Sequence, residues 1–141
     1  MKVSKYMTTK LVTASPDLSV KDAFLMMRKN QVRHLPVLED GKLVGIISDR
    51  DLRRPKWVDA LDDWTQYYQI NDETTVADVM TPNPEVVHTY DRVEKAIKIV
   101  REQRYGALPV LNKEEELVGI LSAYDLLNAL EEFIEGKKSE E

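Results

Sequence analysis

An internal duplication constrains the fold of this chain more than any other feature of its sequence. Residues 33–52 contain a Leu-Pro-Val strand, a short turn, a Leu-Val-Gly-Ile strand and a Ser-x-x-Asp-Leu ending, and residues 107–126 repeat that order. Across the chain, ten identical residues recur at an offset of 73 and seven at an offset of 74, seventeen in all. Since such a repeat is one structural unit written twice, we expect two similar units that pack together.

Each copy predicts the same elements in the same order. Apolar residues at i, i+3, i+4 and i+7 predict a first helix, with Ser19 as its N-cap in copy one and Asp91 in copy two. Two strands of consecutive apolar residues follow, which is typical of strands covered on both faces. A second helix is predicted to begin near Ser48 or Ser122. The expected boundaries are copy one at 1–55, a linker at 56–75, copy two at 76–135 and a disordered tail at 136–141.

The linker carries an aromatic stripe that allows two interpretations. Trp57, Leu61, Trp64 and Tyr68 lie four, three and four residues apart, which predicts a short amphipathic helix. Such a helix packs its stripe on its own domain or presents it to a partner, because aromatic residues are enriched at interfaces. The sequence leaves both interpretations open.

Composition excludes several classes of function. The chain has no cysteine, which excludes disulfides, thiolate metal sites and cysteine catalysis. Its apolar runs are far shorter than the roughly 20 residues that span a bilayer, and its first residues lack a signal segment, so we expect a cytoplasmic protein. The net charge is −5, but residues 28–56 carry eight basic against four acidic side chains. This balance makes nucleic acid an unlikely partner and leaves a small basic region suited to phosphate oxygens.

The repeated motifs resemble the tandem cystathionine-β-synthase-type (CBS) domain pair, or Bateman module. The resemblance rests on Val-x-x-x-Met-Thr, Leu-Pro-Val and Leu-Val-Gly-Ile-(Ile/Leu)-Ser-x-x-Asp-Leu, each present twice, and it covers residues 3–130. Copy one is also similar to proteins related to the acetoin-utilisation regulator and to the regulatory insert of inosine-monophosphate dehydrogenase. The family implies an α/β (α+β) fold of two β-α-β-β-α units, packed sheet to sheet with pseudo-twofold symmetry. It also implies clefts between the repeats for adenosine-containing ligands, and a homodimer.

The Ser-x-x-Asp pairs, Ser48 with Asp51 and Ser122 with Asp125, are the first candidate ligand contacts. A helix N-terminus attracts phosphate, and a carboxylate there can accept hydrogen bonds from the 2′- and 3′-hydroxyls of a ribose. On this chemistry alone, the same residues could equally well do no more than cap the helix. The resemblance favours ligand binding, with the aspartates on the ribose and the serines on the phosphate side.

Arg33 and His34 form the second candidate group. They occupy positions where the family often carries basic residues that hold phosphate, although Arg33 could also be a solvated strand end. Copy two has Gly106 and Ala107 there, which supply space and backbone for a base. A charged His34 that contributes to binding would make the binding weaken as pH rises through its pKa.

The remaining candidates come from the second helix and from the segments that open each copy. Arg50 could reach the same phosphate as Arg33, whereas copy two has Tyr124 at the corresponding position. The cleft served by Asp51 is therefore expected to be the more anion-selective. The family passes its opening segments over the adenine, which adds four candidates for contact with the base: Thr13, Met80, Pro82 and Val86.

The motifs do not support catalysis. Neither repeated serine has a repeated histidine partner, no phosphate loop or dinucleotide fingerprint occurs, and two histidines in unrelated segments are too few for a metal site. We therefore expect a regulatory module rather than an enzyme, with no required cofactor and no metal. It would sense an adenine nucleotide such as AMP, ADP or ATP and signal to an effector protein through a conformational change. The alternatives are a protein-interaction scaffold with vestigial clefts, or a module that binds S-adenosylmethionine or nucleic acid.

Overall fold

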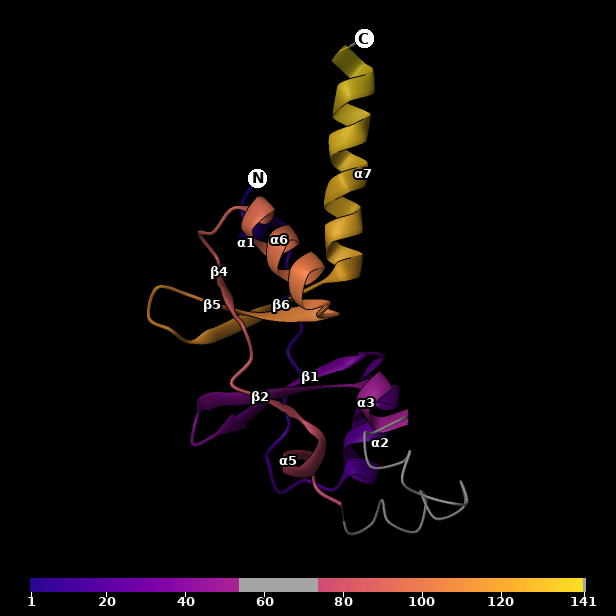
Figure 1. Ribbon diagram of the computed structural model, residues 1–141, viewed down its shortest axis with the longest axis vertical. Helices are drawn as coiled ribbons and strands as arrows, with labels where there is room; N and C mark the ends of the chain where they lie inside the picture. The colour runs from indigo at the N-terminus through magenta and orange to yellow at the C-terminus, as the bar shows by residue number, and fades with distance from the viewer. Residues whose placement is uncertain (54–73, 141) are drawn as a thin grey trace. The chain divides into compact units, whose positions relative to one another are not determined.

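The computed structural model describes residues 1–53 and 74–140, which form two compact units (Figure 1). Unit 1 consists of Met1–Leu11 and Glu85–Glu141, and unit 2 consists of Val12–Pro84. Each unit therefore combines the first residues of one sequence copy with the strands and main helices of the other. The predicted α/β class with two repeated units is confirmed, because each unit holds one three-stranded sheet and its helices.

Unit 2 is built on an antiparallel sheet with the strand order β1-β2-β3. The predicted N-cap of its first helix is confirmed, because Ser19 Oγ accepts a hydrogen bond from the Asp22 amide at 3.1 Å. The helix buries Val20, Ala23 and Met27 against the sheet. The described elements of unit 2 are α2 (Val20–Asn30), β1 (His34–Glu39), β2 (Lys42–Ser48), α3 (Asp49–Arg53), α5 (Val76–Val79) and β3 (Thr81–Pro82).

Unit 1 repeats this plan on a sheet with the order β4-β5-β6, in which β4 runs parallel to β5. The pairing of Val87 with Val110 in this sheet corresponds to a single parallel bridge between Ala14 and Val37 in unit 2. The described elements of unit 1 are α1 (Val3–Tyr6), β4 (Val87–His88), α6 (Val93–Gln103), β5 (Ala107–Leu111), β6 (Leu117–Ser122) and α7 (Ala123–Glu140). The N-cap of α6 is Arg92 and not Asp91 as predicted, since the helix begins at Val93, and the Asp91 carboxylate accepts the His88 amide.

Two repeated motifs meet where the opening segment of one copy crosses a strand of the other. Thr8 pairs with Ile120 of β6, and Thr81 pairs with Ile46 of β2. A Cβ atom on Gly119 would lie 2.9 Å from the Thr8 carbonyl oxygen, and a Cβ on Gly45 would lie 3.0 Å from that of Thr81. The Met-Thr and Val-Gly-Ile motifs therefore occur together for a physical reason, since the crossing backbone leaves no room for a side chain on the strand.

Each unit has its own apolar core. Leu35, Val37 and Ile47 are fully buried in unit 2, and Leu108, Val110 and Leu121 are their fully buried counterparts in unit 1. Both hairpins carry a register irregularity at the same place, between Val37 and Leu38 and between Val110 and Leu111. The two copies thus share packing as well as sequence.

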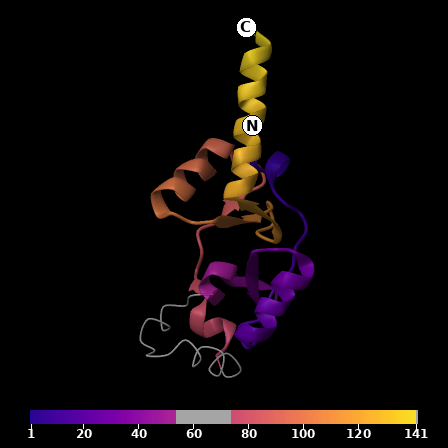
Figure 2. The ribbon, with the colours of Figure 1, turned by 90° about the vertical axis from the view of Figure 1, so that its right-hand side faces the viewer.

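The predicted disordered tail is helical, and most of the predicted linker lies outside the described residues. Residues 136–140, expected to be disordered, are the last residues of α7, and Figures 1 and 2 show this helix continuing well beyond α6. Most of the linker with its aromatic stripe lies outside the described residues, which resume at residue 74. Within the described ranges, no helix has the length and apolarity needed to cross a membrane.

Candidate functional site

The Ser48–Asp51 pair lies where β2 passes into α3 in unit 2. The Ser48 amide donates to Asp51 Oδ2 at 3.0 Å, and the Asp51 amide donates to Ser48 Oγ at 3.1 Å. This reciprocal pair is a capping box, so the capping role that the sequence allowed is realised. Asp51 Oδ1 accepts no hydrogen bond from the described residues, and the side chain is half-buried. Capping therefore leaves one carboxylate oxygen for a ligand.

The fold brings Arg33 and His34 beside this pair. His34 is paired with Ser48 across the β1–β2 hairpin, and the Arg33 carbonyl accepts the Asp49 amide at 2.8 Å. The Arg33 side chain is exposed and forms no ion pair within residues 1–53 and 74–140. Its guanidinium is therefore available for an anion.

A pocket of about 520 Å³ lies next to Arg33 in unit 2. It is bounded by α2, by the connection to β1 and by Asp49 of α3. Arg28 contributes a second guanidinium, which lies over the Phe24 ring at 5.9 Å from its centroid. The lining residues are Phe24, Met27, Arg28, Gln31, Val32, Arg33 and Asp49. Arg28 was not among the site residues expected from the sequence, although its position at the end of a predicted helix, five residues before Arg33, was a usable signal.

His34 has a lowered pKa in the folded chain. Burial of the ring is the main cause, and the positive charge of Arg33 adds to it, while the carboxylates of Asp49 and Asp51 act in the opposite direction. His34 is therefore neutral at pH 7, and Arg33 supplies the charge of this pair. Any dependence of binding on protonated His34 is shifted to more acidic pH than the sequence alone suggested.

The equivalent pair in unit 1 has the same capping geometry but a different environment. The Ser122 amide donates to Asp125 Oδ2 at 2.9 Å, and the Asp125 amide donates to Ser122 Oγ at 3.1 Å. The Thr8 hydroxyl lies 3.2 Å from both carboxylate oxygens of Asp125 and donates to them. Asp125 is only 7% exposed. This contact was not expected from the sequence, although Thr8 belongs to one of the repeated motifs.

The other predicted residues are placed as follows. Gly106 and Ala107 lie beside the Ser122–Asp125 pair, since the Gly106 carbonyl accepts the Ala123 amide at 2.9 Å and Ala107 pairs with Ser122. Arg50 and Tyr124 are exposed on α3 and α7.

The four base candidates are divided between the units. Met80 and Pro82 of unit 2 lie against β2 near Gly45, and Thr13 is half-buried next to the Ala14 bridge. Val86 lies in unit 1, before β4, which pairs with β5 on the edge opposite β6. The fold thus brings Met80 and Pro82 onto the strand that ends at Ser48, whereas Val86 joins the other unit.

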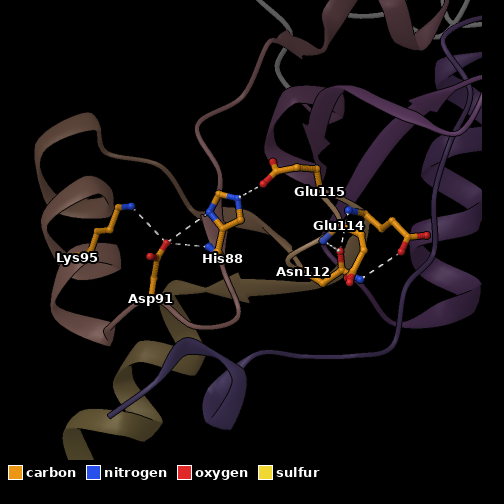
Figure 3. Close-up of polar contacts among 7 residues, drawn as sticks. His88, Asp91, Lys95, Asn112, Glu114 and Glu115 are labelled. Atoms are coloured by element: carbon orange, nitrogen blue, oxygen red, sulfur yellow. Dashed lines mark hydrogen bonds and ion pairs between the residues drawn. The ribbon is translucent and has the colours of Figure 1, made fainter.

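A polar network around His88 was not anticipated from the sequence. Figure 3 shows the His88 ring between two carboxylates, with Nε2 2.9 Å from Glu115 Oε1 and Nδ1 3.7 Å from Asp91 Oδ2. Burial raises the pKa of Asp91, but hydrogen bonds from the His88 amide and from Lys95 outweigh it and hold the pKa below its ordinary value. Among the described residues, no three His, Cys, Asp or Glu side chains are grouped to hold a metal ion. The network links β4, the start of α6 and the β5–β6 turn.

Comparison with known proteins identifies the family. The family model of the CBS domain matches residues 3–55 and 76–132, the two sequence copies. The chain therefore belongs to the CBS domain family.

Individual relatives agree with this assignment. A CBS domain-containing protein of Dictyostelium discoideum is 32% identical over 138 residues, covering 94% of this chain and 93% of that protein. Inosine-5′-monophosphate dehydrogenase of Korarchaeum cryptofilum is also 32% identical, but the match covers 82% of this chain and only 21% of the enzyme. Among solved structures, the CBS-pair protein CBSX2 of Arabidopsis thaliana is 30% identical with a TM-score of 0.75, covering 95% of this chain and 96% of that one.

Proposed function

We propose that this chain is a regulatory module that binds an adenosine-containing nucleotide, AMP, ADP or ATP, through the site in unit 2. The observation that carries the proposal is the Arg33 guanidinium, which has no ion-pair partner among the described residues and lines a pocket of about 520 Å³. The pocket extends to Asp49, between Ser48 and Asp51 in sequence. Arg33 therefore supplies a cation at this pocket, and Asp51, two residues after Asp49, supplies a carboxylate with a free oxygen on the same unit.

The two charged groups suit the two ends of a nucleotide. Asp51 Oδ1 and the remaining lone pair of Oδ2 accept the ribose hydroxyls, while Ser48 keeps the carboxylate oriented through the cap. Arg33 binds the phosphate with its planar, permanently charged guanidinium. Arg28, which lines the same pocket, would contact a longer phosphate chain. The module has a ligand role and no catalytic one.

A relative supports the choice of ligand. CBSX2 of Arabidopsis thaliana, 30% identical to this chain with a TM-score of 0.75, has been crystallised in complex with AMP. The match to the protein in that complex covers 94% of this chain. An adenine nucleotide is therefore the first ligand to test.

Calorimetric titration with AMP, ADP and ATP tests the proposal. Asp51→Asn keeps an oxygen for the Ser48 amide but places an amide group toward the ribose, and we expect about 100-fold weaker binding from the loss of two hydrogen bonds to a charged group. Arg33→Gln should weaken binding about 10-fold or more. Arg92→Gln removes the same charge from an exposed position in unit 1 and should have no effect. No binding by the unmodified chain, or equal binding by all variants, would refute the proposal.

We also propose that the ligand signal passes to an effector protein through a homodimer of the module. Support comes from α7, on which Leu127, Leu130, Phe133 and Ile134 are each more than 40% exposed. Antiparallel pairing with a second α7, centred on this stripe, would bring the apolar residues of the two copies together. A second copy therefore fits this face in polarity. For the ligand to act as a signal, it must bind one dimer arrangement more tightly than another.

A further inference from the structure

The two repeated aspartates, Asp51 and Asp125, are equivalent in sequence but not in their hydrogen bonds. Asp125 accepts the Ser122 amide at 2.9 Å and, in addition, the Thr8 hydroxyl at 3.2 Å from each oxygen. Asp51 accepts the Ser48 amide at 3.0 Å and no other donor from the described part of the chain. Both oxygens of Asp125 thus accept hydrogen bonds from the protein itself, whereas only one oxygen of Asp51 does.

The backbone does not cause this difference. The Thr8 amide donates to the Ile120 carbonyl at 2.7 Å, and the Ile120 amide donates back to Thr8 at 2.9 Å. Thr81, the counterpart of Thr8, pairs with Ile46 at the equivalent position of β2. Its hydroxyl nevertheless makes no hydrogen bond to Asp51 among the described residues. The units therefore share a scaffold and differ in whether the threonine hydroxyl reaches the carboxylate.

The position of the Thr8 hydroxyl matters for a ribose. A ribose diol presents two hydroxyls to the two oxygens of one carboxylate, and the Thr8 oxygen lies at equal distance from both oxygens of Asp125. Thr8 is anchored by two backbone hydrogen bonds, and its branched Cβ restricts rotation of the side chain. With Asp125 only 7% exposed, a diol would have to displace this hydroxyl to bind.

The distribution of basic residues also favours a nucleotide in unit 2 over one in unit 1. Unit 2 supplies Arg33 and Arg50 near its aspartate, whereas unit 1 has Gly106 and Tyr124 at the corresponding positions. A nucleotide phosphate would therefore meet no cation at these positions in unit 1. The loss of phosphate contacts and the occupied carboxylate are independent observations with the same consequence.

We propose that the two repeats are functionally unequal: the chain binds one nucleotide, at unit 2, while the Thr8 hydroxyl closes the ribose position of unit 1. This inference rests on the proposed function. Thr8 is then the residue that determines occupancy, and the Thr8–Asp125 contact is a structural tie between the opening segment and α7.

The stoichiometry of binding tests the inference. Calorimetry with AMP should give one molecule per unmodified chain. Asp51→Asn should weaken that single event and reveal no other site in unit 1. Thr8→Val keeps the shape of the side chain but removes its hydroxyl, and it should add a second, weaker binding event. Thr8→Ser keeps the hydroxyl, so the number of bound molecules should remain one. Thr81→Val is the matched control in unit 2, and its count should remain one.

Several results of these titrations would contradict the inference. Two molecules per unmodified chain, or one molecule bound by Asp51→Asn as tightly as by the unmodified chain, would refute it and leave nucleotide binding itself established. A folded Thr8→Val chain that still binds one molecule would show that the hydroxyl does not close unit 1. If Thr8→Val does not fold, the counts for the unmodified chain and Asp51→Asn decide alone. Absence of any binding would overturn the proposed function together with this inference.

Discussion

Replacing Gly119 by alanine should destabilise unit 1, and replacing Gly136 by alanine should stabilise it. A Cβ at Gly119 would lie 2.9 Å from both Met7 Sδ and the Thr8 carbonyl oxygen, where ordinary contact begins at 3.4 Å. The crossing segment must therefore move by about 0.5 Å. Because the Thr8 carbonyl accepts a hydrogen bond from the Ile120 amide, this movement also strains the backbone. We expect a loss of about 1–3 kcal/mol in the free energy of unfolding.

Gly136 is the matched control for this substitution. It lies in α7, and a Cβ there would meet nothing within 4 Å. Alanine should therefore gain about 0.5–1 kcal/mol from helix propensity and from the reduced entropy of the unfolded chain. Urea titration followed by circular dichroism measures both effects, and thermal unfolding should show a decrease of about 3–12 °C for Gly119→Ala. Equal stability of the two variants would refute the steric account of the Val-Gly-Ile motif.

Two further predictions concern protonation and assembly. Because burial lowers the pKa of His34 below its ordinary value of 6.5, the unfolded chain binds this proton more readily than the folded chain. The free energy of unfolding should therefore keep its full value above about pH 6.5 and decrease as pH falls through the lowered pKa. Urea titrations at pH 7.5 and 5.5 should show a smaller decline for His34→Gln, and an equal decline in both chains would contradict the prediction. Leu130→Asp places a charge in the apolar face of α7 and should convert a dimer to a monomer in sedimentation equilibrium; an unmodified chain that is already monomeric would refute the proposed dimer.

Local sequence patterns predicted the parts of the site that depend on neighbouring residues. The capping boxes at Ser48 and Ser122 join residues three positions apart, and the Ser19 N-cap also has a range of three residues. Such contacts depend on residue type and spacing, which a sequence displays directly. The prediction for Asp91 was wrong because α6 begins one residue later than an Asp91 cap requires, with Arg92, the counterpart of Ser19 at an offset of 73, at its N-cap.

The sequence by itself determined that the chain contains two copies of one unit, the order of helices and strands in each, and that only copy one carries the Arg33–His34 pair. The tertiary structure decided which unit each opening segment joins, because that choice depends on contacts between residues far apart in the chain. It placed Thr8 on Asp125, 117 residues away, left Asp51 with a free oxygen, and lowered the pKa of His34 by burial. Repetition in sequence thus predicts equal scaffolds, whereas the partners of each carboxylate are set by packing.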